Sequence, residues 1–139
     1  MDFFLSINNR EQVIKLPVIP SSFKIPSPVN NETYSTINQG EIKLIGLRGL
    51  KSITIDSFFP VKDYPFLRDR TYKGWEYVEI IESWIDRRIP VRLVITDTPI
   101  NLAMSIDNFE SGIQDGSGDV YYSLVLSEFK FIKLESRQV

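Results

Sequence analysis

The sequence contains no histidine and no cysteine. Without cysteine there can be no disulfide, no thiolate nucleophile and no thiolate metal ligand. Histidine is the usual general base near neutral pH and the commonest metal ligand. The two absences together exclude Ser-His-Asp triads, Cys-His dyads and ordinary zinc sites. We therefore expect no catalytic residues, no metal site and no cofactor.

The sequence also lacks an excess of positive charge and a long hydrophobic run. Its 16 basic and 18 acidic residues give a net charge of -2, so little drives counterion release from DNA or RNA, and we expect no nucleic-acid partner. No run reaches transmembrane length, so we expect no membrane insertion. The apolar start, Met1 to Leu5, has no basic region before it and soon meets polar residues, which is unlike a signal peptide.

What is present suits one globular domain. The chain has 139 residues, of which 42% are hydrophobic and 24% are charged, an ordinary balance for a domain with its own core. We therefore treat residues 1–139 as a single domain. No internal repeat is evident.

Period-two alternation of apolar residues predicts most of the chain as β-strands. Two hairpins are expected in the first half, one joining strands 3–7 and 12–17 and the other joining strands 34–38 and 41–45. A longer strand is expected at 51–59, and three more follow in the second half, with apolar faces at 91–95, 102–106 and 120–126. The alternation shifts by one residue after 126, which predicts a β-bulge near Ser127 and Glu128.

One helix is expected, at residues 74–88. Its apolar stripe has helical spacing and comprises Tyr77, Val78, Ile81, Trp84 and Ile85. Thr71 is a candidate N-cap, and Pro90 prevents continuation. Strands on both sides of a single helix predict a β-rich (α+β) fold, an antiparallel barrel or sandwich with one flanking α-helix.

A proline-rich segment, residues 17–31, is predicted to be an extended arm, because proline cannot donate to a strand ladder. Two interpretations stand side by side: a loop lying on the body of its own chain, or an arm reaching a neighbouring subunit. In the second case the candidate interface residues are the apolar ones of the arm: Val18, Ile19, Phe23, Ile25 and Val29.

For three other groups of residues we favour a structural role over a role in metal binding, catalysis or ligand contact. The run Asp115 to Asp119 faintly resembles a calcium loop, but no glutamate stands at EF-hand spacing, so a flexible turn before a strand is expected. The helical glutamates Glu76, Glu79 and Glu82 are expected to form a solvated face. Trp75, Trp84 and nearby tyrosines are expected mostly to pack the helix, with Trp75 also considered as an exposed contact.

Several short segments together resemble one family. They are residues 53–60 (ITIDSFFP), 74–85 (GWEYVEIIESWI), 90–96 (PVRLVIT) and 116–124 (GSGDVYYSL), together with the opening from Phe3 to Phe23. The pattern is similar to the N-terminal domain of LysM-bearing tail proteins of PBSX-type prophages, Gram-positive myophages and contractile bacteriocins. The resemblance implies a tail-tube-like fold. The family's LysM module would follow near Leu134 to Val139, and no such module is seen in this sequence.

The resemblance implies a structural subunit of a contractile phage tail or bacteriocin baseplate, joining the tail tube to the central hub. Its partners would be further copies of itself in a ring, expected to be a hexamer, and the tube, hub or spike and baseplate proteins. Assembly would take place in the bacterial cytoplasm, and the product would be a phage tail or tail-like particle. The alternative hypothesis is a module that binds cell-wall glycan, with Trp75 and nearby tyrosines as a stacking platform.

Overall fold

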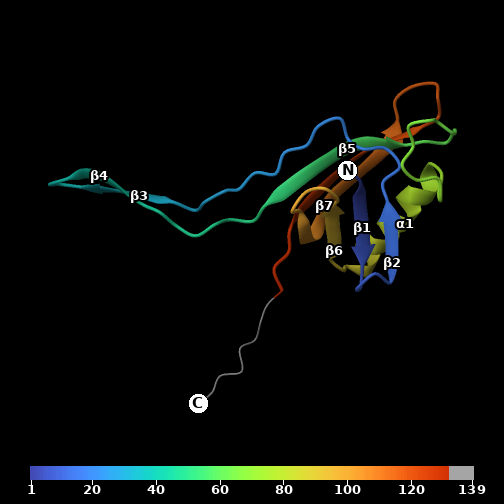
Figure 1. Ribbon diagram of the computed structural model, residues 1–139. Coiled ribbons are helices and arrows are strands. Elements are labelled where there is room, and N and C mark those ends of the chain that lie inside the picture. The colour runs from blue at the N-terminus through green and yellow to red at the C-terminus, as the bar shows by residue number, and fades with distance from the viewer. Residues whose placement is uncertain (132–139) are drawn as a thin grey trace, which may run out of the picture.

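The computed structural model describes residues 1–131. Six strands form one fully antiparallel sheet in the order β2-β1-β6-β7-β8-β5, and β3 and β4 form a separate two-stranded ribbon (Figure 1). The elements are β1 (Phe3–Ile7), β2 (Gln12–Lys15), β3 (Glu32–Thr36), β4 (Gly40–Leu44), β5 (Ser52–Phe59), α1 (Trp75–Arg87), β6 (Val91–Ile95), β7 (Asn101–Ile113) and β8 (Val120–Glu128). The predicted β-rich (α+β) fold with one helix is confirmed.

The hydrophobic core lies between one face of the six-stranded sheet and α1. In β8 every second residue from Val120 to Leu126 is buried, and in β5 the residues Ile53, Ile55 and Phe59 are buried on one face. The alternation seen in the sequence is therefore the alternation between core and outer face. The edge strands β2 and β5 do not pair with each other. The chain just after β2 lies beside β5, where the Ser57 hydroxyl donates to the Val18 carbonyl oxygen at 3.1 Å.

Helix α1 packs on the sheet as its apolar stripe predicts. Ile81 and Trp84 are 0% and 1% exposed. The Trp84 indole Nε1 donates to Gln12 Oε1 at 3.0 Å, which ties the helix to β2 while satisfying a buried donor. Arg88 ends the helix in a left-handed conformation with φ of 57°.

The start of α1 differs from the prediction. Gly74, not Thr71, holds the N-cap position, and no side chain caps the helix. The Thr71 hydroxyl instead donates to Asp69 Oδ1 at 2.7 Å. Glycine is required at 74 because its φ is +44° and a Cβ there would lie 2.6 Å from Cγ1 of Val61.

The β-bulge also lies elsewhere. β8 runs without interruption to Glu128, and the irregularity is on β7, where Ile106 and Asn108 oppose Leu126 and Val125 and leave Asp107 unpaired. The prediction of a bulge at Ser127 and Glu128 was wrong. A bulge places an extra residue in one of two paired strands and changes which residues of the two strands face each other. The sequence of β8 alone therefore does not show which strand holds the extra residue.

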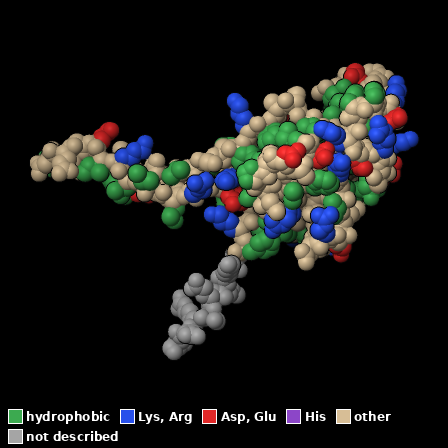
Figure 2. All heavy atoms as spheres, viewed as in Figure 1, with side chains coloured by type: hydrophobic (Ala, Val, Ile, Leu, Met, Phe, Trp, Pro, Cys, Tyr) green, Lys and Arg blue, Asp and Glu red, His purple; other side chains and the backbone are tan. Residues whose placement is uncertain are grey.

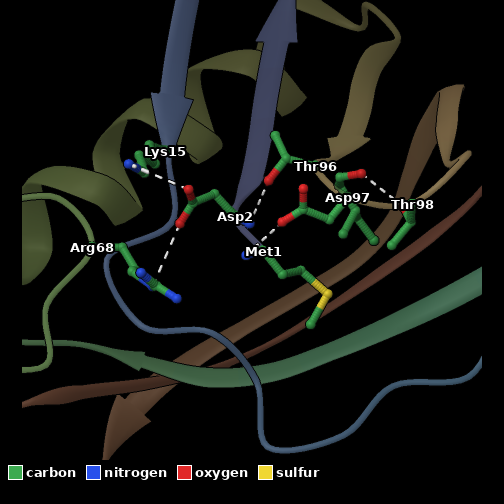
Figure 3. A network of polar contacts seen from close by, with 8 residues as sticks. Met1, Asp2, Lys15, Arg68, Thr96, Asp97 and Thr98 are labelled. Carbon is green, nitrogen blue, oxygen red and sulfur yellow. Dashed lines mark hydrogen bonds and ion pairs between the residues drawn. The ribbon is translucent and has the colours of Figure 1, made fainter.

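Polar contacts fasten the N-terminus to the body (Figure 3). The Asp2 amide donates to Thr96 Oγ1 at 2.8 Å, and the terminal amino group lies 3.2 Å from a carboxylate oxygen of Asp97. The Asp2 carboxylate also faces Lys15 at 3.6 Å and Arg68 at 3.5 Å. The start of the chain is therefore linked to β2, to the turn after β6 and to the loop before α1. Among the described residues, no helix is long and apolar enough to cross a membrane.

Candidate assembly interface

The β3–β4 hairpin extends away from the rest of the molecule (Figure 1). Between Ser21 and Leu50, only Phe23, Ile25, Ile42 and Gly49 are even partly buried. The structure thus has two parts, a body that holds the sheet, the helix and the core, and a projecting hairpin that is almost fully exposed. We use "projecting hairpin" for residues 28–50.

The base of the projecting hairpin is held by backbone hydrogen bonds. Val29 and Arg48 form an antiparallel bridge, Asn30 N donates to the Leu47 oxygen at 2.8 Å, and Gly49 N donates to the Pro28 oxygen at 2.8 Å. The two chain segments approach so closely at Gly46 that a Cβ there would lie 1.7 Å from the Asn30 carbonyl oxygen. The two arms of the projecting hairpin are therefore joined by backbone hydrogen bonds at its base as well as between β3 and β4.

The tip is closed by a side-chain turn. The Thr36 hydroxyl donates to the Gly40 oxygen at 2.8 Å and accepts from Gln39 N at 3.1 Å. Gly40 has φ of +71°, which glycine adopts without steric cost. The sequence predicted this turn at Gln39 and Gly40. The structure shifts the first strand of the predicted hairpin two residues toward the base, to 32–36, and the second strand one residue toward the tip, to 40–44.

The ribbon made by β3 and β4 is amphipathic. The register pairs Tyr34 with Ile42 and Glu32 with Leu44, so these side chains share one face, while Ser35 and Thr33 share the other with Glu41 and Lys43. Tyr34 and Leu44 are each 50% exposed although they belong to the apolar face. A two-stranded ribbon is at best marginally stable alone, so an apolar face left half-exposed by residues 1–131 makes the ribbon a candidate interaction surface.

Exposed apolar side chains continue from the ribbon to its base. Ile37 at the tip is 102% exposed, and Ile45 and Leu47 are 88% and 85% exposed. Figure 2 shows apolar side chains along this narrow extension, away from the body. Single exposed apolar residues are ordinary, but several on one projecting segment make that segment a candidate interaction site.

The predicted arm, residues 17–31, divides into two parts. Ile19, Phe23 and Ile25 pack against the core of their own chain, and the Phe23 ring meets Phe3 edge-on at 5.3 Å between centroids. Val29 is 48% exposed and belongs to the base of the projecting hairpin. Val18, the fifth predicted interface residue, is partly buried beside β5. The part of the chain that leaves the body therefore begins later than the sequence suggested.

A groove of about 700 Å³ lies where β5, β7 and β8 meet the segment after β2. Its lining includes the acidic residues Asp56 and Glu110 and no basic residue. Tyr122 also lines it, and the tyrosine hydroxyl is buried without a hydrogen-bond partner among residues 1–131. Burial raises the pKa of Tyr122, so this hydroxyl keeps its proton and is available as a donor.

The Asp115–Asp119 loop is hydrogen-bonded to the loop that follows β5. The buried Asp119 carboxylate accepts from Val61 N at 3.0 Å and from the Tyr64 hydroxyl at 2.7 Å. Asp115 accepts from Ser117 and from the Tyr121 hydroxyl, and these hydrogen bonds, those from Ser117 first, lower the pKa of Asp115. Both carboxylates are thus engaged by protein donors. In the described part of the chain, no cluster of three or more acidic residues could hold a metal ion.

The remaining candidates from the sequence lie apart from the groove. Glu76, Glu79 and Glu82 are exposed on α1. Trp75 is 47% exposed. The favoured expectation, that it packs the helix, was therefore wrong, and the structure agrees with the alternative of an exposed position. Tyr72 turns its ring edge-on to Tyr77, and among the described residues Trp75 forms no aromatic pair, so no stacked platform is assembled around it.

The fold of the chain is similar to that of chains in gene transfer agent particles. The chain is similar over 94% of its length to a chain in the virion of a native gene transfer agent particle, with a TM-score of 0.56 and 14% identity, covering 92% of that chain. The match to a chain in the tail of an empty gene transfer agent particle with C6 symmetry has the same values. At this identity the likeness establishes the fold, and it confirms the predicted fold class.

In sequence, the chain is similar to one curated protein in particular. It is 36% identical over 129 residues to the uncharacterized protein YqbP of Bacillus subtilis strain 168, a match that covers 89% of this chain. The chain spans 58% of the length of YqbP. No protein-family model matches the chain.

The sequence did not reveal how far the hairpin projects. Its one signal was composition: residues 42–50 (IKLIGLRGL) carry five large apolar residues, yet their alternation is broken by two glycines. A strand of a packed sheet would keep its apolar residues on one face.

Proposed function

We propose that this chain is a structural subunit of a phage tail or a phage-tail-like particle, and that its copies associate through the projecting hairpin. The observation that carries the proposal is the apolar face of that hairpin, which stays half-exposed among the described residues 1–131. A projecting segment on one part of a subunit and a receiving surface on another make a head-to-tail contact. Repetition of such a contact gives a ring where the rotation closes.

The comparisons support this proposal at the level of fold. One of the matched chains comes from a tail with C6 symmetry, and the same symmetry is what a closed ring of six head-to-tail contacts has. We therefore propose a hexameric ring. We also propose, from the resemblance of the sequence to LysM-bearing tail proteins, that the ring sits in the baseplate between the tail tube and the central hub.

The proposal describes a protein that binds and does not catalyse. Among the described residues, Asp115 and Asp119 are the carboxylates that most resemble a functional cluster, and both accept hydrogen bonds from protein groups in or near their loop. The proposed partners are further copies of the chain and the tube, hub and baseplate proteins. The proposed place of assembly is the bacterial cytoplasm.

The experiment is a deletion of the ribbon. Residues 31–45 are replaced by a short Gly-Ser turn that keeps the Val29–Arg48 bridge, and the variant replaces the wild-type chain in the producing bacterium. We expect a folded protein with the melting temperature of the wild type, and few or no tail-like particles in negative-stain images. The matched control is Glu79→Ala on the exposed face of α1, which should leave particle numbers unchanged.

Two results would contradict the proposal. One is a normal number of complete particles with the ribbon deleted. The other is the absence of the wild-type chain from any tail-like particle, combined with its retention on purified peptidoglycan in a pull-down, which would favour the glycan-binding hypothesis instead.

A further inference from the structure

We propose that residues 18–27 form an autoinhibitory strap, which covers the free edge of β5 and keeps β5 of one copy from pairing with β5 of another. The strap leads from β2 to the base of the projecting hairpin and belongs to the body. This contact goes beyond the proposed function, since it involves neither the projecting hairpin nor a tail-like particle.

One edge of β5 carries backbone groups without a partner. Glu128 N donates to the Lys51 oxygen at 2.7 Å, and hydrogen-bonded pairs alternate along an antiparallel ladder, so the odd-numbered residues of β5 are those that bond to β8. Within residues 1–131, no hydrogen bond reaches the N–H and C=O groups of the even-numbered residues, which point away from β8. These residues are Ser52, Thr54, Asp56 and Phe58.

The strap runs along this free edge. At its start the Val18 oxygen accepts from the Ser57 hydroxyl at 3.1 Å, and just beyond its end the Pro28 oxygen accepts from Gly49 N at 2.8 Å. The strand side, from 49 to 57, spans about 26 Å, and the strap side, from 18 to 28, reaches at most about 35 Å when extended. The strap therefore follows β5 in the opposite direction with little slack, as the trace between β2 and β3 shows (Figure 1).

The strap is held by its side chains and does not pair with β5. Phe23 and Ile25 pack against the core, where the Phe23 ring meets Phe3 edge-on. Pro20 and Pro26 have no N–H to donate. In the described part of the chain, no backbone hydrogen bond joins the strap to β5. The strap thus covers the edge while leaving its hydrogen-bonding groups unused, which is one way in which native proteins protect an edge strand.

Without the strap, the free edge of β5 is complementary to itself. When two β5 strands pair antiparallel about residue 55, Thr54 faces Asp56 of the second copy, and Ser52 faces Phe58. This register places the free backbone groups of both copies opposite each other. It also keeps the two Asp56 carboxylates from facing each other directly, where like charges would be destabilising. A two-fold pair of this kind is closed, so it would withdraw copies from a ring.

Amide hydrogen exchange of the free wild-type chain, followed residue by residue by NMR, tests whether the edge is free. The amides of Thr54 and Asp56 should exchange at least about 100-fold faster than those of Ile53 and Ile55, which bond to β8. Equal protection at all four positions would mean that the edge is already paired, and would overturn the proposal.

Loosening the strap tests what it keeps out. Phe23→Ser with Ile25→Ser removes the side chains that hold it, and the variant should dimerise with a dissociation constant at least about tenfold lower than that of the wild type. Sedimentation velocity measures this change, and the Thr54 and Asp56 amides should gain protection in the dimer. The matched control is Lys24→Ser, an exposed position of the strap, which should associate no more than the wild type.

A further substitution separates edge pairing from association through exposed apolar side chains. Thr54→Pro removes an N–H of the free edge and leaves the ladder to β8 intact. Added to Phe23→Ser and Ile25→Ser, it should restore the monomer.

A strap variant that stays monomeric, or a dimer that survives Thr54→Pro, would overturn the proposal. Phe23→Ala alone, a milder change, provides the same test if the double variant does not fold. None of these measurements uses a tail-like particle, so their failure would leave the proposed function intact.

Discussion

Replacing an isoleucine by alanine should have a very different effect on stability in the body and in the projecting hairpin. Ile81 is 0% exposed on α1, and Ile37 is 102% exposed at the tip of the hairpin. Ile81→Ala removes buried methylene groups and leaves a cavity between the helix and the sheet, which should cost about 2–5 kcal/mol of unfolding free energy. Ile37→Ala removes atoms that contact only solvent, so it should change that free energy by less than about 0.5 kcal/mol.

The assay is equilibrium unfolding of the dilute protein in urea, followed by circular dichroism. A domain of this size loses about 3–5 °C of melting temperature per kcal/mol, so Ile81→Ala should also melt about 6–25 °C below the wild type. Ile37→Ala should melt with the wild type. The two variants make the same chemical change and differ only in location.

Either of two outcomes would refute this reasoning. A loss of less than about 0.5 kcal/mol for Ile81→Ala would mean that α1 does not pack on the sheet through its apolar stripe. A loss above about 1 kcal/mol for Ile37→Ala in dilute protein would mean that the tip is covered by its own body.

Three further predictions concern the body and are checked by the same unfolding assay. Gly74→Ala should cost about 1–3 kcal/mol because its φ is +44° and the new Cβ meets a side chain at 2.6 Å, whereas Gly116→Ala, with open space around it, should be near neutral. Asp119→Ala should cost about 1–3 kcal/mol because two donors lose their acceptor, and Asp115→Ala, at an exposed site, clearly less. Since burial raises the pKa of Tyr122, the unfolded chain releases this proton from about pH 10 upward while the folded chain keeps it, so stability should fall as pH rises above 10. Tyr122→Phe should make that fall less steep; an unchanged slope would contradict the assignment.

The elements that follow from the sequence are those in which one face is buried. Alternation in β5 and β8 and the stripe on α1 were readable because each places its apolar residues against the same core. The first hairpin, β1 and β2, followed from strands on either side of a polar turn, and Asn8, Asn9 and Arg10 in that turn do have positive φ.

The errors have a common cause, because each depended on contacts between distant parts of the chain. Gly74 replaced Thr71 at the start of α1 because the chain approaches Val61 closely there. The bulge belongs to β7 because register is a property of two strands, and one strand's sequence does not locate it.

The candidate interface was only partly foreseeable for the same reason. The sequence marked residues 17–31 as an arm, but Phe23 finds a partner in Phe3 on its own body, and the segment that leaves the body is centred on β3 and β4. A proline-rich composition shows that a segment forms no ladder; it does not show which surface the segment lies on. The groove, which draws residues from four separate parts of the chain, has no signature in the sequence.

The central claim, that copies of this chain join through the projecting hairpin, is tested most directly by a cryo-electron microscopy structure of the assembled particle that contains it. The account predicts density for the projecting hairpin of each copy against the body of the next copy, repeated around a ring. A hairpin folded back onto the body of its own chain, or one left in solvent while the copies meet through other surfaces, would contradict it.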